Sequence, residues 1–299
     1  MNNFSILIDT NSDLPQEYMD EHGIEMIPVP FIIDGVQHNG GHWQEITAKE
    51  FYDALRNGSV ASTALINSES YVRVFTEYAK KKQPLLVLTL SSGLSGTYQN
   101  SVIALDDIEQ EYPGCAIRTV DCTTASGGAG LLAVLAVKKR SEGMTLDAAA
   151  DWLEGKKHSC ISLFTVNDLM YLHRGGRLSR LSAVAGSIIG VKPLLNVAPD
   201  GTLKLKDKVR GRAGALKTLV SQMARSLNPG TTLDTIVISH SDCLEEAESL
   251  AVTIKSTIAV HDIKIVMMSP VIGAHVGPGA IALFFEADMT REEYEKKFY

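Results

Sequence analysis

A serine-rich turn carries the side chains best suited to ligand chemistry in this sequence. It spans residues 91–97, Ser-Ser-Gly-Leu-Ser-Gly-Thr, between an apolar run at residues 85–90 and a helical pattern that begins near Tyr98. Backbone N–H groups at a helix N-terminus, together with hydroxyls, can bind a phosphate or a carboxylate. Serine and threonine also cap many helices without binding any ligand. The turn alone leaves both interpretations open, but it contains neither a serine-hydrolase G-x-S-x-G motif nor a P-loop.

One histidine stands in a setting that calls for a polar partner. His275 lies within residues 271–279, Val-Ile-Gly-Ala-His-Val-Gly-Pro-Gly, where glycines allow close backbone approach and the other side chains are apolar. A polar ring buried there without a partner would cost on the order of 1–3 kcal/mol. A carboxylate would satisfy it, so we interpret His275 as a candidate ligand-binding residue.

Four arginines could bind a phosphate or an acidic protein, because a guanidinium presents a fork of donors that matches both. They are Arg174, Arg177, Arg210 and Arg212. Alternatively, these arginines lie in exposed basic loops that bind nothing. This interpretation is least convincing for Arg177, which lies in a glycine-containing stretch. No paired carboxylates stand out as acid and base, no nucleophile–base pair can be assigned from the sequence, and no Cys/His cluster has zinc spacing. The residues therefore favour a binding protein, without a metal or catalytic residues of its own, over a self-sufficient enzyme.

Composition limits the class of protein. The 299 residues are 45% hydrophobic and 21% charged, as expected for one large or two moderate globular domains. No apolar run approaches the ~20 residues of a membrane span, and no basic signal region precedes the strand pattern at Phe4, so we expect a cytoplasmic protein without an integral membrane segment. Its four cysteines are widely spaced and are expected to be reduced and structural.

Charge is distributed unevenly along the chain. The net charge of −7 argues against nucleic acid as the main partner. Residues 156–217 nevertheless hold 12 Lys and Arg against three acids, which leaves −16 for the rest of the chain. Such a basic segment is either a solvated face or a surface for an anionic partner.

The N-terminal half predicts a parallel sheet. Apolar runs near residues 4–8, 85–90 and 116–120 are each followed by a hydroxyl-rich turn and a helical pattern, with turns at residues 9–12, 91–97 and 121–126. Right-handed β-α-β connections bring the carboxyl ends of such strands to one edge, where binding crevices form. We therefore expect the three turns to cluster and to border a polar crevice.

A change of composition at residues 155–158 predicts a boundary between two domains, residues 1–157 and 158–299. The second domain is expected to contain a basic glycine-hinged loop at residues 170–178 and a short apolar helix near 183–189. Further strands are expected near residues 161–166, 191–197, 203–209, 235–239, 263–268 and 280–285, with helices near 212–227 and 244–258.

Several blocks together resemble the DegV family over nearly the whole chain. The matching blocks are residues 9–15 (Asp-Thr-Asn-Ser-Asp-Leu-Pro), 62–67, 90–99, 171–178 (Tyr-Leu-His-Arg-Gly-Gly-Arg-Leu), 189–195 and 272–279. The sequence departs from the family at residues 64–66, Ala-Leu-Ile, where many members have Ser-Gln-Pro.

The resemblance implies a two-domain α/β protein, with an N-terminal parallel sheet and a C-terminal mixed sheet, that binds one long-chain fatty acid in an apolar tunnel. Residues carried over by motif to the carboxylate are Thr63, Ser91, Ser92, Ser95 and His275. Arg177 and Arg210 match positions that the family uses for kinase docking or phosphoryl transfer. The family implies no covalent cofactor. Its partner in some bacteria is an ATP-dependent fatty acid kinase, which forms acyl-phosphate for phospholipid synthesis.

Two other functions stay open at this point. A small-molecule phosphotransferase would have to bind a nucleotide by itself. A regulatory lipid sensor would have to bind a partner other than a kinase in a lipid-dependent way.

Overall fold

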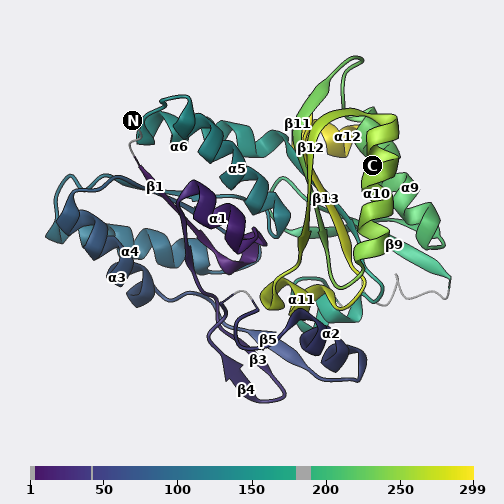
Figure 1. Cartoon of the computed structure of the whole chain (residues 1–299), viewed down its shortest axis with the longest axis horizontal. Helices are drawn as coiled ribbons and strands as arrows, with labels where there is room; N and C mark the ends of the chain where they lie inside the picture. Colours follow the sequence, from purple (N-terminus) through teal and green to yellow (C-terminus); the bar gives the residue numbers. More distant parts are fainter. Residues whose placement is uncertain (1–3, 42, 180–189) are drawn as a thin grey trace.

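A computed structural model describes residues 4–41, 43–179 and 190–299. Its N-terminal part is built on a four-stranded sheet in which all neighbouring strands are parallel (Figure 1). The strand order is β2 (Ile24–Ile27), β1 (Ser5–Asp9), β6 (Leu85–Thr89) and β7 (Ile117–Asp121). The predicted parallel sheet is therefore confirmed.

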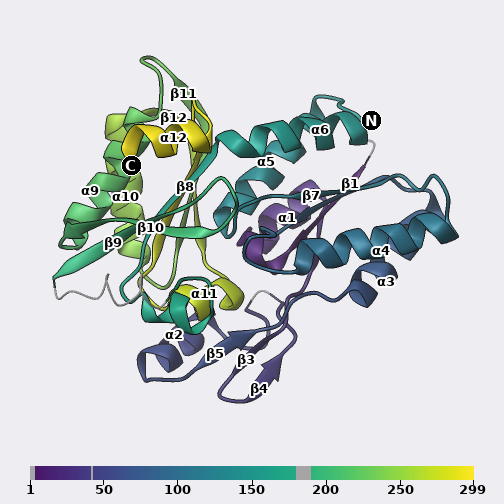
Figure 2. The same ribbon diagram turned by 180° about the vertical axis from the view of Figure 1, so that it is seen from behind.

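Helices cover both faces of this sheet, because alternate strand residues are apolar on each side. One face packs against α3 (Ser68–Lys81) and α4 (Thr97–Glu111). The other face packs against α1 (Gln16–His22), α5 (Gly127–Ser141) and α6 (Leu146–Lys156), so that α4 and α6 lie well apart (Figure 2).

The C-terminal part is a six-stranded mixed sheet. Its order is β10 (Leu203–Arg210), β9 (Val191–Val197), β8 (Cys160–Thr165), β13 (Ile281–Glu286), β11 (Thr232–His240) and β12 (Ala259–Met267). Only β11 and β12 pair in parallel. Its outer face is covered by α9 (Arg212–Arg225), α10 (Leu244–Thr257) and α12 (Arg291–Phe298), and its inner face by α5. Helix α5 thus contacts both sheets and forms the centre of the molecule.

A small antiparallel sheet belongs to the N-terminal part in sequence but packs on the C-terminal part. It consists of β4 (Val36–His38), β3 (Phe31–Ile33) and β5 (Ala61–Thr63), and with α2 (Ala48–Arg56) it lies beside α11 (Pro270–Val276) in Figure 1. The Tyr52 hydroxyl of α2 donates to the Met268 carbonyl at 2.8 Å. Strand β5 brings Thr63 to α11.

The segment at residues 170–178, expected to be a glycine-hinged loop, begins with the helix α7 (Met170–Arg174). The glycine-rich segment around His275, for which no helix was predicted, forms α11. Helix α11 begins with Pro270 at its first position and with the Ser269 hydroxyl accepting from the Ile272 N–H, which are favourable N-terminal features despite the glycines. The helix predicted at residues 183–189 lies outside the described residues.

The chain passes from α6 through η2 (Lys157–Ser159) into β8 at the predicted boundary. Because α5 and α2 both contact the other half, the division into two domains stays a prediction. No helix in the described ranges is long and apolar enough to span a membrane. All four cysteines are free.

Candidate functional site

A pocket of about 770 Å³, counted with its opening, lies between the two large sheets. Its apolar lining comes from both halves of the chain: Val29, Ala64, Leu90, Leu94, Ala125, Phe164, Leu172, Val197, Leu203, Met268, Val271, Ile272, Val276, Ala282 and Phe284. Its polar lining is Asn11, Ser95, Thr97, Ser126, Arg177 and His275.

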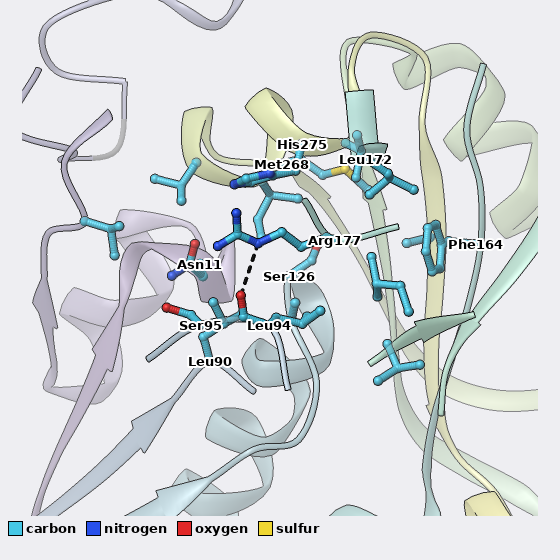
Figure 3. Close-up of a pocket in the computed structure, with 18 of the residues that line it drawn as sticks. Asn11, Leu90, Leu94, Ser95, Ser126, Phe164, Leu172, Arg177, Met268 and His275 are labelled. Atoms are coloured by element: carbon cyan, nitrogen blue, oxygen red, sulfur yellow. Dashed lines mark hydrogen bonds between the residues drawn. The ribbon is translucent and has the colours of Figure 1, made fainter. Parts of the chain in front are cut away.

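The pocket has a polar side and an apolar side. In Figure 3 the side chains of Asn11, Ser95, Arg177 and His275 gather on the side of the N-terminal strands, whereas Phe164 lies across the pocket on the mixed sheet. Such an arrangement suits an amphipathic ligand with a small polar head and an apolar body.

The three turns that follow β1, β6 and β7 build the polar side, as the sequence predicted. The Asp9 carboxylate accepts from the Leu90 N–H at 3.2 Å, which ties the first turn to the second. The Ser91 N–H donates to the Thr124 carbonyl at 2.9 Å, which ties the second to the third. The expected clustering of the turns is confirmed.

His275 lies in the pocket wall beside Thr63. The imidazole Nε2 and the Thr63 Oγ1 are 2.9 Å apart, and the Nδ1 is buried without a hydrogen-bond partner among the described residues. Burial and the nearby Arg177 lower the pKa of His275 to about 4, so the ring is neutral at pH 7. A Cβ on Gly175 would lie 2.1 Å from Nδ1, so the close packing of the ring requires glycine there.

Arg177 lies in the pocket lining rather than on the outer surface. Its half-buried side chain donates from Nε to the Leu94 carbonyl at 3.1 Å and from Nη1 to the Gly175 carbonyl. The bond to Leu94, drawn in Figure 3, joins the segment after α7 to the serine-rich turn. With His275 neutral, Arg177 is the cation of the described pocket lining. Its predicted part in docking a partner stays a prediction.

The three serines of the turn differ in what they contact. Ser95 lines the pocket, and its Oγ is 3.0 Å from that of Thr97. Ser91 is fully buried and donates to the Gly201 carbonyl at 2.9 Å, which fixes the turn on the β9–β10 hairpin. Ser92 is exposed and donates to Asp121 at 2.5 Å. Neither Ser91 nor Ser92 is part of the described pocket lining, and α4 begins without a side-chain cap.

Asn11 is a pocket residue that sequence reasoning did not single out. It belongs to η1 (Thr10–Ser12), is 1% exposed, and has no partner among the described residues for its Oδ1. The available signal was an amide within a hydroxyl-rich turn at the carboxyl end of a strand, but such turns also carry amides that only shape the backbone.

Asp13 fixes α11 against the first turn. It is 2% exposed, accepts from the Ser269 N–H at 2.8 Å, and accepts from the hydroxyl of the pocket residue Ser126. Burial raises its pKa to about 7, and that of Asp9 to about 6. Asp13 therefore supports the helix that carries His275 without lining the pocket itself.

The basic segment is partly neutralised by ion pairs. Lys206 pairs with Glu295, and Arg212 pairs with Glu246 at 2.7 Å. Arg210 is exposed at the end of β10, away from the pocket lining, so the structure does not bring it together with Arg177 in one site. Within residues 4–41, 43–179 and 190–299, no cluster of three His, Cys, Asp or Glu side chains could hold a metal ion.

Comparison with known proteins agrees with this architecture. The DegV family model matches residues 3–288. A DegV domain-containing protein of Clostridium perfringens is 38% identical over 293 residues, covering 98% of this chain and 100% of that protein. A DegV lipid-binding protein from Thermotoga maritima has a crystal structure that matches with a TM-score of 0.84 at 28% identity, covering 96% and 99% of the two chains. A DegV family protein from Thermus thermophilus, described as binding fatty acid, matches with a TM-score of 0.82 at 27% identity, covering 96% of this chain and 100% of that chain.

Proposed function

Because this chain belongs to the DegV family, we propose that it binds one long-chain fatty acid, with the carboxylate at the polar side of the pocket and the acyl chain along its apolar side. The observation that carries the proposal is the pairing of one cation, Arg177, with a wall of apolar side chains in a single pocket. Related proteins described as lipid-binding or fatty-acid-binding share the fold.

The carboxylate site is proposed to contain Thr63, Ser95, Arg177 and His275. With its proton on Nε2, the neutral imidazole donates to the Thr63 Oγ1, and the Thr63 hydroxyl proton is then free to be donated to a carboxylate. The Ser95 hydroxyl and the Arg177 guanidinium add further donors from the other side. Ser91 and Ser92, carried over by motif, act in this proposal by shaping the turn, because their hydroxyls already donate elsewhere.

The acyl chain supplies most of the binding free energy. Each buried CH₂ contributes roughly 0.8 kcal/mol, so a chain of about 16 carbons can bind tightly after the cost of ordering it. Phe164, Phe284 and Val197 would contact the chain far from the carboxylate.

We further propose that the chain does no catalysis alone and presents the acid to an ATP-dependent kinase, which forms acyl-phosphate. The support is the position of Arg177, which lines both the main pocket and a second, solvent-open pocket with Gly176, Thr202 and Lys204. A phosphoryl donor bound by a partner could approach the carboxylate from that side. The exposed Arg210 is proposed to contact the partner.

Calorimetry separates this proposal from a phosphotransferase that acts alone. The delipidated chain should bind palmitic acid and should give no heat of binding with ATP and magnesium. Binding of ATP without binding of any C14–C18 fatty acid would contradict the proposal. With a purified fatty acid kinase, acyl-phosphate should form only when the chain with bound fatty acid is present. A partner that binds the chain in a lipid-dependent way and is not a kinase would instead favour the regulatory lipid sensor.

A further inference from the structure

Asn11, like His275, is a polar residue of the pocket whose hydrogen bonding is incomplete. It is 1% exposed, lines the pocket, and its Oδ1 is buried without a partner in the described part of the chain. A buried acceptor without a donor is unfavourable, so such atoms in a binding pocket point to a group on the ligand.

The orientation of the amide follows from its neighbour Asp9. The Asn11 backbone N–H donates to the Asp9 Oδ1 at 2.8 Å. Burial raises the pKa of Asp9, and a hydrogen bond that the Asn11 side chain donates to this carboxylate offsets part of the rise. An ionised carboxylate only accepts, so the amide nitrogen faces Asp9 and the oxygen faces the pocket. Figure 3 shows the Asn11 oxygen on the side of the Arg177 guanidinium and its nitrogen on the opposite side.

No donor in the described part of the chain hydrogen-bonds to the Asn11 Oδ1. Ser95 and Thr97 share a hydrogen bond of 3.0 Å, Ser126 donates to Asp13, and Arg177 donates from Nε and Nη1 to backbone carbonyls. A fatty acid carboxylate cannot supply the missing proton, because it has only acceptors.

We propose that the preferred ligand is a fatty acid with a hydroxyl group close to its carboxyl group, a 2- or 3-hydroxy acid, whose O–H donates to the Asn11 Oδ1. This inference rests on the proposed function and deepens it. The hydroxyl belongs near the carboxyl group because Asn11 shares the polar side with Arg177 and His275 (Figure 3), whereas Phe164 and the apolar side receive the distal chain. A site with a buried polar group discriminates strongly against the analogue that leaves it unpaired.

Competition binding to the delipidated chain tests this inference. Palmitic acid is compared with 2-hydroxy-, 3-hydroxy- and 16-hydroxypalmitic acid. At least one of the 2- and 3-hydroxy acids should bind about tenfold more tightly than palmitic acid. The 16-hydroxy acid should bind more weakly than palmitic acid, because its hydroxyl enters the apolar side.

Asn11→Leu, which has a similar shape and no acceptor, should abolish the preference. Ser95→Ala, at the same side of the pocket, should weaken the binding of palmitic acid and of its 2- and 3-hydroxy derivatives alike, and should therefore retain the preference. If the unmodified chain binds palmitic acid as tightly as, or more tightly than, both the 2- and 3-hydroxy acids, the inference is overturned, whether or not the variant folds. A preference for a hydroxy acid that survives in Asn11→Leu also overturns it. If none of the four acids binds, the proposed function itself fails.

Discussion

Replacement of Arg177 by methionine is expected to weaken fatty-acid binding through loss of one charge. Methionine keeps most of the apolar stem and removes the guanidinium, the cation of the described pocket lining. A hydrogen bond to a charged group contributes about 1.5–3 kcal/mol, and the lower part of this range applies because Arg177 is only half-buried. At roughly 1.4 kcal/mol for each factor of ten, palmitic acid should bind about 10- to 30-fold more weakly.

Displacement of a fluorescent fatty acid measures this effect, and palmitic acid methyl ester separates charge from shape. The ester carries no carboxylate, so Arg177→Met should change its affinity by less than about threefold. Arg174→Met is the matched control: Arg174 is exposed, lies over the Tyr171 ring at 4.5 Å, and is not part of the described pocket lining. Equal losses for acid and ester would refute the reasoning, because Arg177 would then act only through its bonds to the Leu94 and Gly175 carbonyls.

Three further substitutions test the surroundings of the site. Gly175→Ala places a Cβ 2.1 Å from the His275 Nδ1 and should reduce palmitic acid binding about tenfold or more, whereas Gly155→Ala, with open space around the new Cβ, should not change it in the same displacement assay. Thr63→Val removes the partner of the His275 Nε2 and should lower the free energy of unfolding by about 1 kcal/mol in a urea titration, besides weakening fatty-acid binding. Burial raises the pKa of Asp13 from 3.8 to about 7, so between these pH values the folded chain retains a proton that the unfolded chain loses. The free energy of unfolding should therefore fall as pH rises from about 4 to 7, by up to roughly 4 kcal/mol. Urea titrations of Asp13→Asn should show a smaller fall.

Each of these predictions has an outcome that contradicts it. Unchanged lipid binding in Gly175→Ala would mean that the position of the imidazole does not matter to the ligand. A Thr63→Val variant that binds palmitic acid normally would remove Thr63 from the carboxylate site. An identical pH dependence in Asp13→Asn would show that Asp13 is ionised in the folded chain throughout this range.

The parallel half of the fold could be predicted from the sequence because its signals are local. Mostly apolar runs such as residues 85–90 give buried strands, and the polar turns after them follow directly. The small sheet could not be predicted in the same way, because β3, β4 and β5 have three residues each and exist through pairing with one another. Helix α11 was missed because glycines at its positions resemble a loop, although packing against α2 and α7 stabilises it.

The sequence predicted which turns build the site but not which of their side chains line the pocket. Ser91, Ser92 and Ser95 are equivalent in the sequence, and only tertiary contacts with Gly201 and Asp121 distinguish them. Arg177 was singled out by its glycine-rich setting, but its bond to Leu94, 83 residues away, is what brings it to the pocket. Such partners depend on how the two sheets meet around α5, which no local pattern encodes.

Native mass spectrometry of the chain purified without added lipid tests the central proposal most directly. One molecule of a long-chain fatty acid per chain, identified after extraction, is the predicted result. Recovery of the chain without lipid, followed by failure to take up C14–C18 fatty acids, would contradict the proposed function. This range of chain lengths is a rough estimate from the acyl burial that tight binding needs.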